Sequence, residues 1–168
     1  MLYDITVPTS IRTLRNLSKC LEKSAGFADA KKVPMEVILN SRLAIDQFPL
    51  TRQVQIACDT AKLGAARLSG ATAPTHDDSE KTLAEVQARI HSTISFLETL
   101  NKDMFKDAET RKITTPRWDG KWLTGEEYAM HHILPNLYFH ATTAYSILRH
   151  NGVDVGKSDY LGQMPYKS

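Results

Sequence analysis

Apolar residues recur every three or four positions in four separate stretches of the chain, and this period constrains the fold more than any other feature. Such a spacing places the apolar side chains on one face of an α-helix. The four stretches are residues 10–26, 49–69, 77–100 and 125–151. Four amphipathic helices in one chain bury their apolar faces best against one another. The sequence therefore predicts an all-α domain built as a four-helix bundle.

Residues that favour helix termini mark the ends of the first two long helices. Ser10 is suited to cap the first helix and Gly26 to end it. Pro49 suits the first turn of the second long helix, where proline gives up no helical hydrogen bond, and Gly70 follows its last turn. Between these two helices, a short helical turn is expected over residues 35–40.

Two capping boxes mark the starts of the last two long helices. In a capping box, a side chain at the helix start and a glutamate three residues later satisfy each other's backbone N–H groups. Residues 77–80 and 124–127 both have this pattern. Pro135 lies inside the last helix and should kink it, because proline donates no hydrogen bond. Gly152 is placed to end that helix.

The helical period disappears over residues 102–124. Here residues 111–115 and 121–123 contain side chains typical of strands, and they flank Asp119-Gly120, a dipeptide typical of hairpin turns. The sequence therefore predicts a small hairpin or irregular insert before the last helix.

Size and charge narrow the class of protein. The chain has 168 residues, of which 42% are hydrophobic and 24% charged, as is usual for one globular domain. The formal net charge is only +2 and no run of Lys or Arg exceeds two, which argues against nucleic acid or an anionic membrane as partner. Neither a membrane-spanning run nor a signal peptide is visible. We expect one cytoplasmic domain over residues 1–168.

Three polar residues form a row along the last helix. His132, Asn136 and His140 are spaced by four residues, so their side chains lie on one side of the helix, at the border of its apolar face. The two imidazoles are about 12 Å apart along the axis by helical rise, too far to bind one metal ion together. Two structural readings stay open: His140 as a hydrogen-bonded core histidine, and Asn136 as a partner for backbone groups freed by Pro135.

Polar groups beside an apolar seam need hydrogen-bond partners from a facing helix. The second long helix offers three such groups: Gln53, Gln55 and Asp59. We therefore expect a polar pocket between the second and last long helices, centred on His140. In such a pocket His140 is the candidate catalytic residue, a general base whose tautomer Asp59 or a glutamine would fix.

Several segments of the chain resemble one protein family. The motifs are residues 134–140 (LPNLYFH), 144–153 (AYSILRHNGV), 156–162 (GKSDYLG) and 46–50 (DQFPL). With these motifs, nearly the whole chain is similar to a family of uncharacterised bacterial and fungal proteins. That family looks like a branch of the DinB/YfiT-like metalloenzyme superfamily. The resemblance implies an up-and-down four-helix bundle.

The resemblance also implies where a metal would bind. Members of the superfamily hold a divalent metal with three histidines, one from the second helix and two, four residues apart, from the last. His140 matches the final histidine, but Asn136 stands where its partner would be, and Gln55 or Asp59 is nearest to the third position. An Asn, His and Gln set is a poor ligand shell for zinc or nickel, because neutral amide oxygens bind such ions weakly. A metal is therefore not expected, and one bound here would be held by His140, Asn136 and Gln55.

Three hypotheses follow for the function. The first is a DinB-like bundle with a degenerate metal site, which binds a small polar ligand with His140, Asn136, Gln53, Gln55 and Asp59. The second is a metal-dependent thiol-transferase or hydrolase-like enzyme that uses zinc or nickel. The third is a non-enzymatic homodimeric scaffold, in which the polar row is structural. Whether the protein is an enzyme is left open by the sequence, and a homodimer is expected under each hypothesis.

Overall fold

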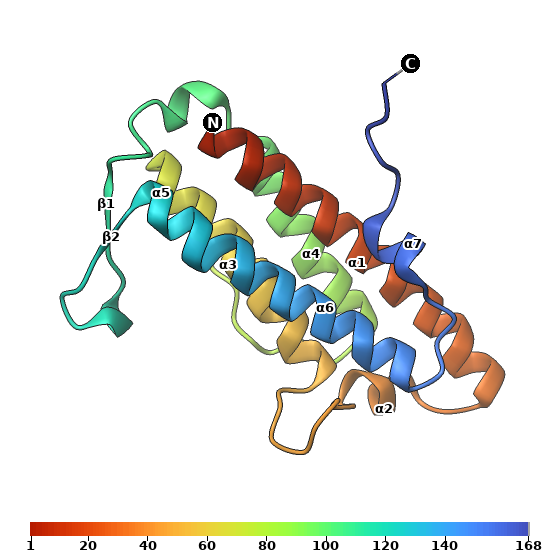
Figure 1. The fold of residues 1–168 in the computed structure, drawn as a ribbon. Coiled ribbons are helices and arrows are strands. Elements are labelled where there is room, and N and C mark those ends of the chain that lie inside the picture. Colours follow the sequence, from red (N-terminus) through yellow and green to blue (C-terminus); the bar gives the residue numbers. More distant parts are fainter. Residues whose placement is uncertain (168) are drawn as a thin grey trace.

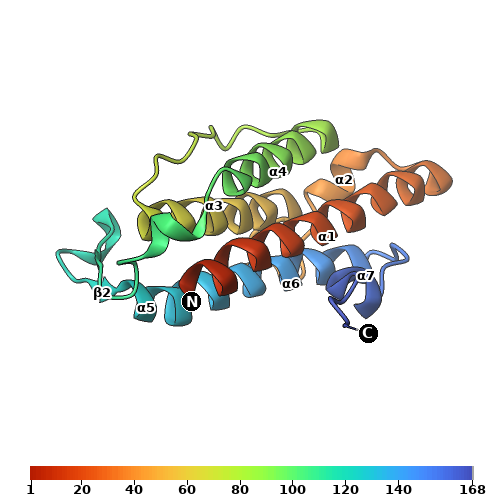
Figure 2. The same ribbon diagram turned by 90° about the horizontal axis from the view of Figure 1, so that it is seen from above.

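The computed structural model describes residues 1–167 and has four long helices within that range, packed side by side (Figure 1). They are α1 (Leu2–Lys31), α3 (Leu50–Ser69), α4 (Leu83–Glu98) and α6 (Leu134–His150). Seen from above, they form one elongated bundle (Figure 2). The all-α four-helix bundle predicted from the sequence is confirmed.

Chain direction does not alternate at every step of the bundle. Helices α1 and α6 run one way, and α3 and α4 run the other way (Figures 1 and 2). The parallel pair arises because residues 70–82 return along the length of the bundle before α4 begins. The side-chain contacts follow the same direction along both helices: Asp59 of α3 pairs with Arg89 of α4, and His76 contacts both Lys62 of α3 and Ser92 of α4, each about one turn further on. A long crossover of this kind joins parallel neighbours in many helical bundles.

Helix α1 is longer than the sequence indicated. It runs from Leu2 to Lys31, so Ser10 and Gly26 lie inside it rather than at its ends. The helix continues at its N-terminus because further apolar residues extend the buried face. At its other end Lys32 takes the left-handed conformation, with φ of 55°. Gly26 has nothing within 4 Å of its missing side chain, so it neither breaks the helix nor fits a close contact.

The predicted boundaries of the next two helices are confirmed. Helix α2 (Met35–Leu39) follows Pro34, and α3 starts at Leu50 directly after Pro49. Gly70 ends α3 with φ of 81°, a conformation that costs an L-residue with a side chain more than it costs glycine.

The capping box of α4 is not the predicted one. Thr82 and Glu85 cap this helix: the Glu85 carboxylate accepts from the Thr82 backbone N–H at 2.9 Å, and the Thr82 hydroxyl accepts from the Glu85 N–H at 3.3 Å. The predicted box at residues 77–80 fails because Asp78 and Glu80 bind Arg89 instead. An arginine is a stronger partner for a carboxylate than a backbone N–H.

The predicted hairpin is confirmed in the insert before the last helix (Figure 1). A 3-10 turn, η1 (Lys102–Phe105), leads to strand β1 (Lys112–Ile113), which pairs antiparallel with β2 (Leu123–Thr124). A second 3-10 turn, η2 (Pro116–Trp118), precedes the turn at Asp119 and Gly120, both of which have positive φ.

The predicted capping box at Thr124 and Glu127 is confirmed and starts α5 (Gly125–Tyr128). The chain continues through a π-helical turn, η3 (Ala129–Ile133), into α6. The expected disturbance at Pro135 therefore takes the form of a wide turn just before it, because a residue without an N–H leaves one carbonyl of that turn unpaired. Gly152, with φ of 97°, follows the end of α6.

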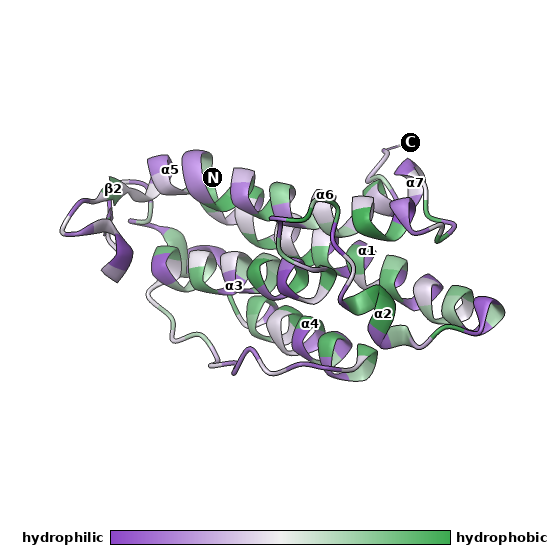
Figure 3. Cartoon of the chain, turned by 90° about the horizontal axis from the view of Figure 1, so that it is seen from below, coloured by the Kyte–Doolittle hydropathy of each residue, from purple (hydrophilic) through white to green (hydrophobic). Residues whose placement is uncertain are grey.

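Apolar side chains from all four long helices fill the centre of the bundle. Hydrophobic and hydrophilic residues alternate around each helix (Figure 3), as the sequence period requires. Glycine allows α3 and the π-turn to approach closely: a side chain added at Gly64 would meet Ile133 at 2.8 Å.

The tail after α6 forms the short helix α7 (Lys157–Leu161), and Asn16 of α1 donates to the Tyr160 carbonyl at 3.0 Å. No helix in residues 1–167 is long and apolar enough to cross a membrane.

Candidate functional site

The polar pair nearest the expected site joins α6 to α3. His140 is 8% exposed and Gln53 is 1% exposed. The His140 Nδ1 and Gln53 Oε1 atoms are 2.7 Å apart. The apolar face of each helix surrounds this pair, so the hydrogen bond satisfies two groups that would otherwise be buried without partners. The structure thus brings together two of the residues singled out in the sequence.

A backbone carbonyl decides which way this hydrogen bond runs. The Gln53 Nε2 group donates to the Phe48 carbonyl at 3.0 Å. A carbonyl can only accept, so the amide oxygen of Gln53 must be the atom that faces His140. The oxygen also only accepts, and therefore His140 Nδ1 carries the proton. Its other ring nitrogen, Nε2, is left with a free lone pair in the neutral ring.

The imidazole of His140 is held neutral. Burial lowers its pKa, and the positive charge of Arg52 lowers it further. Nε2 has no hydrogen-bond partner in residues 1–167, and His140 as a whole is only 8% exposed. The Phe139 ring meets His140 edge-on at 5.1 Å, and the Phe48 ring lies under the guanidinium of Arg52. Both are more than half exposed.

A second polar pair lies one turn away on the same seam. Asn136 Nδ2 donates to Thr60 Oγ1 at 2.7 Å. Asn136 thus binds a side chain of α3 rather than the backbone beside Pro135. Thr60 was not predicted, and its spacing of seven residues from Gln53 was the available signal, because residues seven apart share one face of a helix.

The structure does not bring Gln55 and Asp59 to His140. Gln55 Nε2 donates to Glu80 at 2.8 Å, and Asp59 accepts from Arg89 at 2.8 Å. Both contacts are on the side of α3 that faces α4 and residues 70–82. The physical reason is rotation about the helix axis: Gln55 and Asp59 lie about 200° and 240° around from Gln53.

Arg89 is the centre of a charge cluster that the sequence analysis missed. Its side chain is only 1% exposed, and its guanidinium lies 2.8 to 2.9 Å from carboxylate oxygens of Asp59, Asp78 and Glu80. Burial acts to raise the pKa of Glu80, but hydrogen bonds from Arg89 and Gln55 outweigh it and the pKa is lowered. An arginine within the apolar stripe of α4, between Val86 and Thr93, was the signal that could have found this cluster.

His132 leaves the row predicted along the last helix. The π-turn changes the angular position of residues before Leu134, and His132 stacks on Tyr128 with ring centroids 5.2 Å apart. Trp118 of the insert meets the same imidazole edge-on at 5.8 Å. His132 is therefore a packing residue between α5 and the insert, and burial lowers its pKa.

The side chains at the seam do not fit a zinc or nickel site. The donors brought together are one imidazole, two amides and a hydroxyl, from His140, Gln53, Asn136 and Thr60. Such ions prefer imidazole, thiolate and carboxylate ligands, which stay bound against competition from water. In residues 1–167, no three His, Cys, Asp or Glu side chains are grouped to hold a metal.

Stability should fall as the pH drops through the ordinary range of histidine. Burial, the largest cause in each case, lowers the pKa of His76, His132 and His140 from 6.5. The unfolded chain therefore takes up protons at pH values where the folded rings stay neutral, and these protons favour unfolding. No stability is lost well above pH 6.5, and progressively more is lost below it. Melting from about pH 7.5 to about pH 5.5 should show a falling Tm, less steep in His140→Gln; a constant Tm would contradict this.

Comparisons with known proteins place the chain in a family. A family model described as a domain of unknown function (DUF1993) matches residues 2–161. The crystal structure of a DinB family member protein from Shewanella denitrificans is 60% identical to this chain, with a TM-score of 0.96 over 100% of this chain and 96% of that one. A search of curated proteins gives no match. The chain belongs to the DUF1993 family and is a DinB-like helical-bundle protein.

Proposed function

We propose that the protein binds a small molecule through a hydroxyl or thiol group at the seam between α3 and α6, and that His140 Nε2 accepts the hydrogen bond. The observation that carries this proposal is the chain of contacts from the Phe48 carbonyl through Gln53 to His140 Nδ1. This chain of contacts fixes the tautomer of a neutral imidazole and leaves Nε2 as an acceptor without a partner in residues 1–167. An acceptor held in this way is prepared to bind a donor without further ordering.

The same arrangement supports a role for His140 as a general base. When Nε2 takes a proton from a hydroxyl or thiol, the ring becomes positive, and the Gln53 oxygen at Nδ1 stabilises that charge. The positive charge of Arg52 disfavours the protonated His140 ring. His140 is therefore a weak base that releases the proton again easily. Proton transfer at Nε2 needs no metal, in keeping with the donor set of the seam.

The surroundings of Nε2 favour a ligand that also has an apolar part. Phe139, whose ring meets His140 edge-on, is 55% exposed, and Phe48, whose carbonyl accepts from Gln53, is 53% exposed. A ligand that covers these rings removes apolar surface from water and gains free energy from it. We therefore expect the donor group to sit on His140 and the hydrocarbon to lie against the two rings.

Phenol and anisole test this proposal, because they share a ring and differ in the donor O–H. Titrations followed by amide chemical shifts should show phenol binding near His140 and Gln53, with anisole about fivefold weaker, as expected for one neutral hydrogen bond of roughly 1 kcal/mol. The preference should vanish in His140→Ala and persist in the matched control His91→Ala, an exposed histidine of α4. Equal affinity of wild-type protein for the two probes, or no binding of either, would contradict the proposal.

A further inference from the structure

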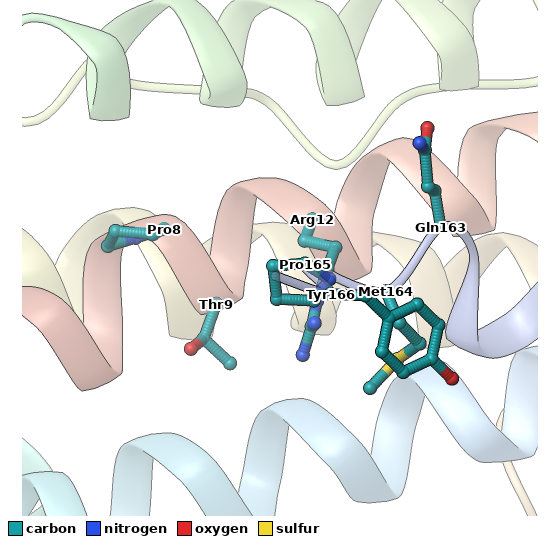
Figure 4. Close-up of a pocket in the computed structure, with 7 residues that line it drawn as sticks. All are labelled: Pro8, Thr9, Arg12, Gln163, Met164, Pro165 and Tyr166. Carbon is teal, nitrogen blue, oxygen red and sulfur yellow. The ribbon is translucent and has the colours of Figure 1, made fainter. Parts of the chain in front are cut away.

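A cavity lies between α1 and the chain that follows α7. It has a volume of about 510 Å³, within the usual range for a site that holds a small organic molecule. Its walls come from one turn and a half of α1 and from the segment after Gly162 (Figure 4). The lining residues are Pro8, Thr9, Arg12, Gln163, Met164, Pro165 and Tyr166.

Arg12 brings the only charge among these lining residues. Across residues 1–167, no carboxylate lies within ion-pair distance of its guanidinium, whereas Arg15 on the next turn is paired with Glu98. Its charge acts on the phenol of Tyr138, where it opposes the burial that raises the pKa, so the α6 side chain is close to the same guanidinium. Arg12 and Thr9 both extend toward the α6 side of α1 (Figure 4). Arg12 is therefore the one lining residue that can only donate, and it brings a full positive charge.

The remaining walls are largely apolar. Pro8 of α1 faces Pro165 and Met164 across the cavity, and the Tyr166 ring lies beside them (Figure 4). Met164 is 38% exposed and Tyr166 is 88% exposed, so much of this surface is in contact with water. A hydrocarbon group placed between these side chains would remove both surfaces from water together.

We infer that this cavity binds an amphipathic organic anion, a carboxylate with an apolar body. The guanidinium can donate two parallel hydrogen bonds to one carboxylate, which is the pairing that arginine makes best. The apolar body then lies between Pro8 and the tail residues Met164 and Tyr166. Neither feature alone selects a ligand. Together they do, because the unpaired positive charge of Arg12 excludes cationic ligands and the apolar wall excludes purely polar solutes.

This site is independent of the one at His140. Tyr138 and His140 are two residues apart on α6, so their side chains point about 200° apart around the helix. The cavity is on the α1 side of α6 and the His140 seam is on the α3 side. The two proposals can therefore fail separately.

The test uses 4-phenylbutyrate, its uncharged analogue 4-phenylbutanol and inorganic phosphate, each titrated into the full-length protein by calorimetry. We expect 4-phenylbutyrate to bind, the alcohol to bind about tenfold more weakly, and phosphate not to compete, because it has no apolar body. Arg12→Gln should weaken the acid about tenfold and leave the alcohol unchanged. Arg15→Gln is the matched control, three residues along the same helix, and should bind as wild type.

Tyr166→Ser tests the apolar wall and should weaken both phenyl compounds alike. The inference is overturned if the acid does not bind at millimolar concentration, if the acid and the alcohol bind equally, or if Arg12→Gln binds the acid as tightly as wild type. Phosphate that displaces the acid would also overturn it, because the site would then recognise charge alone. Binding that maps to His140 instead of Arg12 would overturn this inference while leaving the proposed function intact.

Discussion

Replacing Gly125 with alanine is expected to lower the free energy of unfolding by about 3 kcal/mol or more. A side-chain carbon added at Gly125 would lie 1.7 Å from the Ala108 carbonyl oxygen and 3.0 Å from Leu68. The obstacle is backbone, which cannot rotate aside as a flexible side chain can. The insert and the start of α5 would have to separate, which also strains the bond from the Glu126 N–H to the Glu109 carbonyl. Urea unfolding followed by circular dichroism measures the change.

Gly26→Ala is the matched control for that substitution. Gly26 lies inside α1, and an added side-chain carbon would meet nothing within 4 Å. Alanine in a helix interior is more stable than glycine by about 0.5 to 1 kcal/mol, so this variant should be more stable than wild type. Two glycine-to-alanine changes with opposite signs would establish that the contact at Ala108 matters. A small or stabilising effect at Gly125 would contradict the packing described for the insert.

Replacing Arg89 with leucine is expected to cost about 3 kcal/mol of stability. The guanidinium pairs with three carboxylates, from Asp59, Asp78 and Glu80, in a place where its own side chain is 1% exposed. Without it, like charges face one another and lose their hydrogen bonds. Asp78 is 41% exposed and partly solvated, so the expected cost is at the lower end of that known for broken buried ion pairs. Urea unfolding again gives the value.

Arg15→Leu provides the control for removal of an arginine. Arg15 pairs with Glu98 at the surface, where their side chains are 56% and 48% exposed. Water and salt screen such a pair, so its loss should cost less than about 1 kcal/mol. Similar losses for the two arginine variants would show that the cluster at Arg89 has no special part in holding residues 70–82. We also expect amide hydrogen exchange in residues 70–82 to be faster than in wild type for Arg89→Leu, but not for Arg15→Leu.

Helix boundaries were predictable where the terminating residue acts through its own backbone. Gly70 and Gly152 end helices because each adopts positive φ, and Pro49 directly precedes α3, at the N-cap position with an extended backbone. Ser10 and Gly26 misled the prediction because both residues are tolerated inside a long helix whose apolar face continues past them. Tertiary burial over thirty residues outweighs one local signal.

The polar seam was predictable only in part, for a geometric reason. The sequence shows that α3 carries three polar side chains, Gln53, Gln55 and Asp59, but not which of its sides faces which neighbour. Helix α3 packs against both α4 and α6, so it has two buried sides. Gln53 turned out to face α6, and the other two face α4. The angular position of His132 around the helix could not be predicted either, because a π-turn leaves no clear periodic signal in the sequence.

Burial and the charge of Arg52 lower the pKa of His140 and favour the neutral ring, and Gln53 fixes its tautomer, with the proton on Nδ1 and the lone pair on Nε2. Long-range proton–nitrogen correlation spectra of protein labelled with ¹⁵N-histidine report both nitrogens directly. At neutral pH we expect a protonated Nδ1 and an unprotonated Nε2 for His140, with Gln53→Leu giving a mixture of tautomers. A protonated Nε2, or a charged ring at neutral pH, would contradict it.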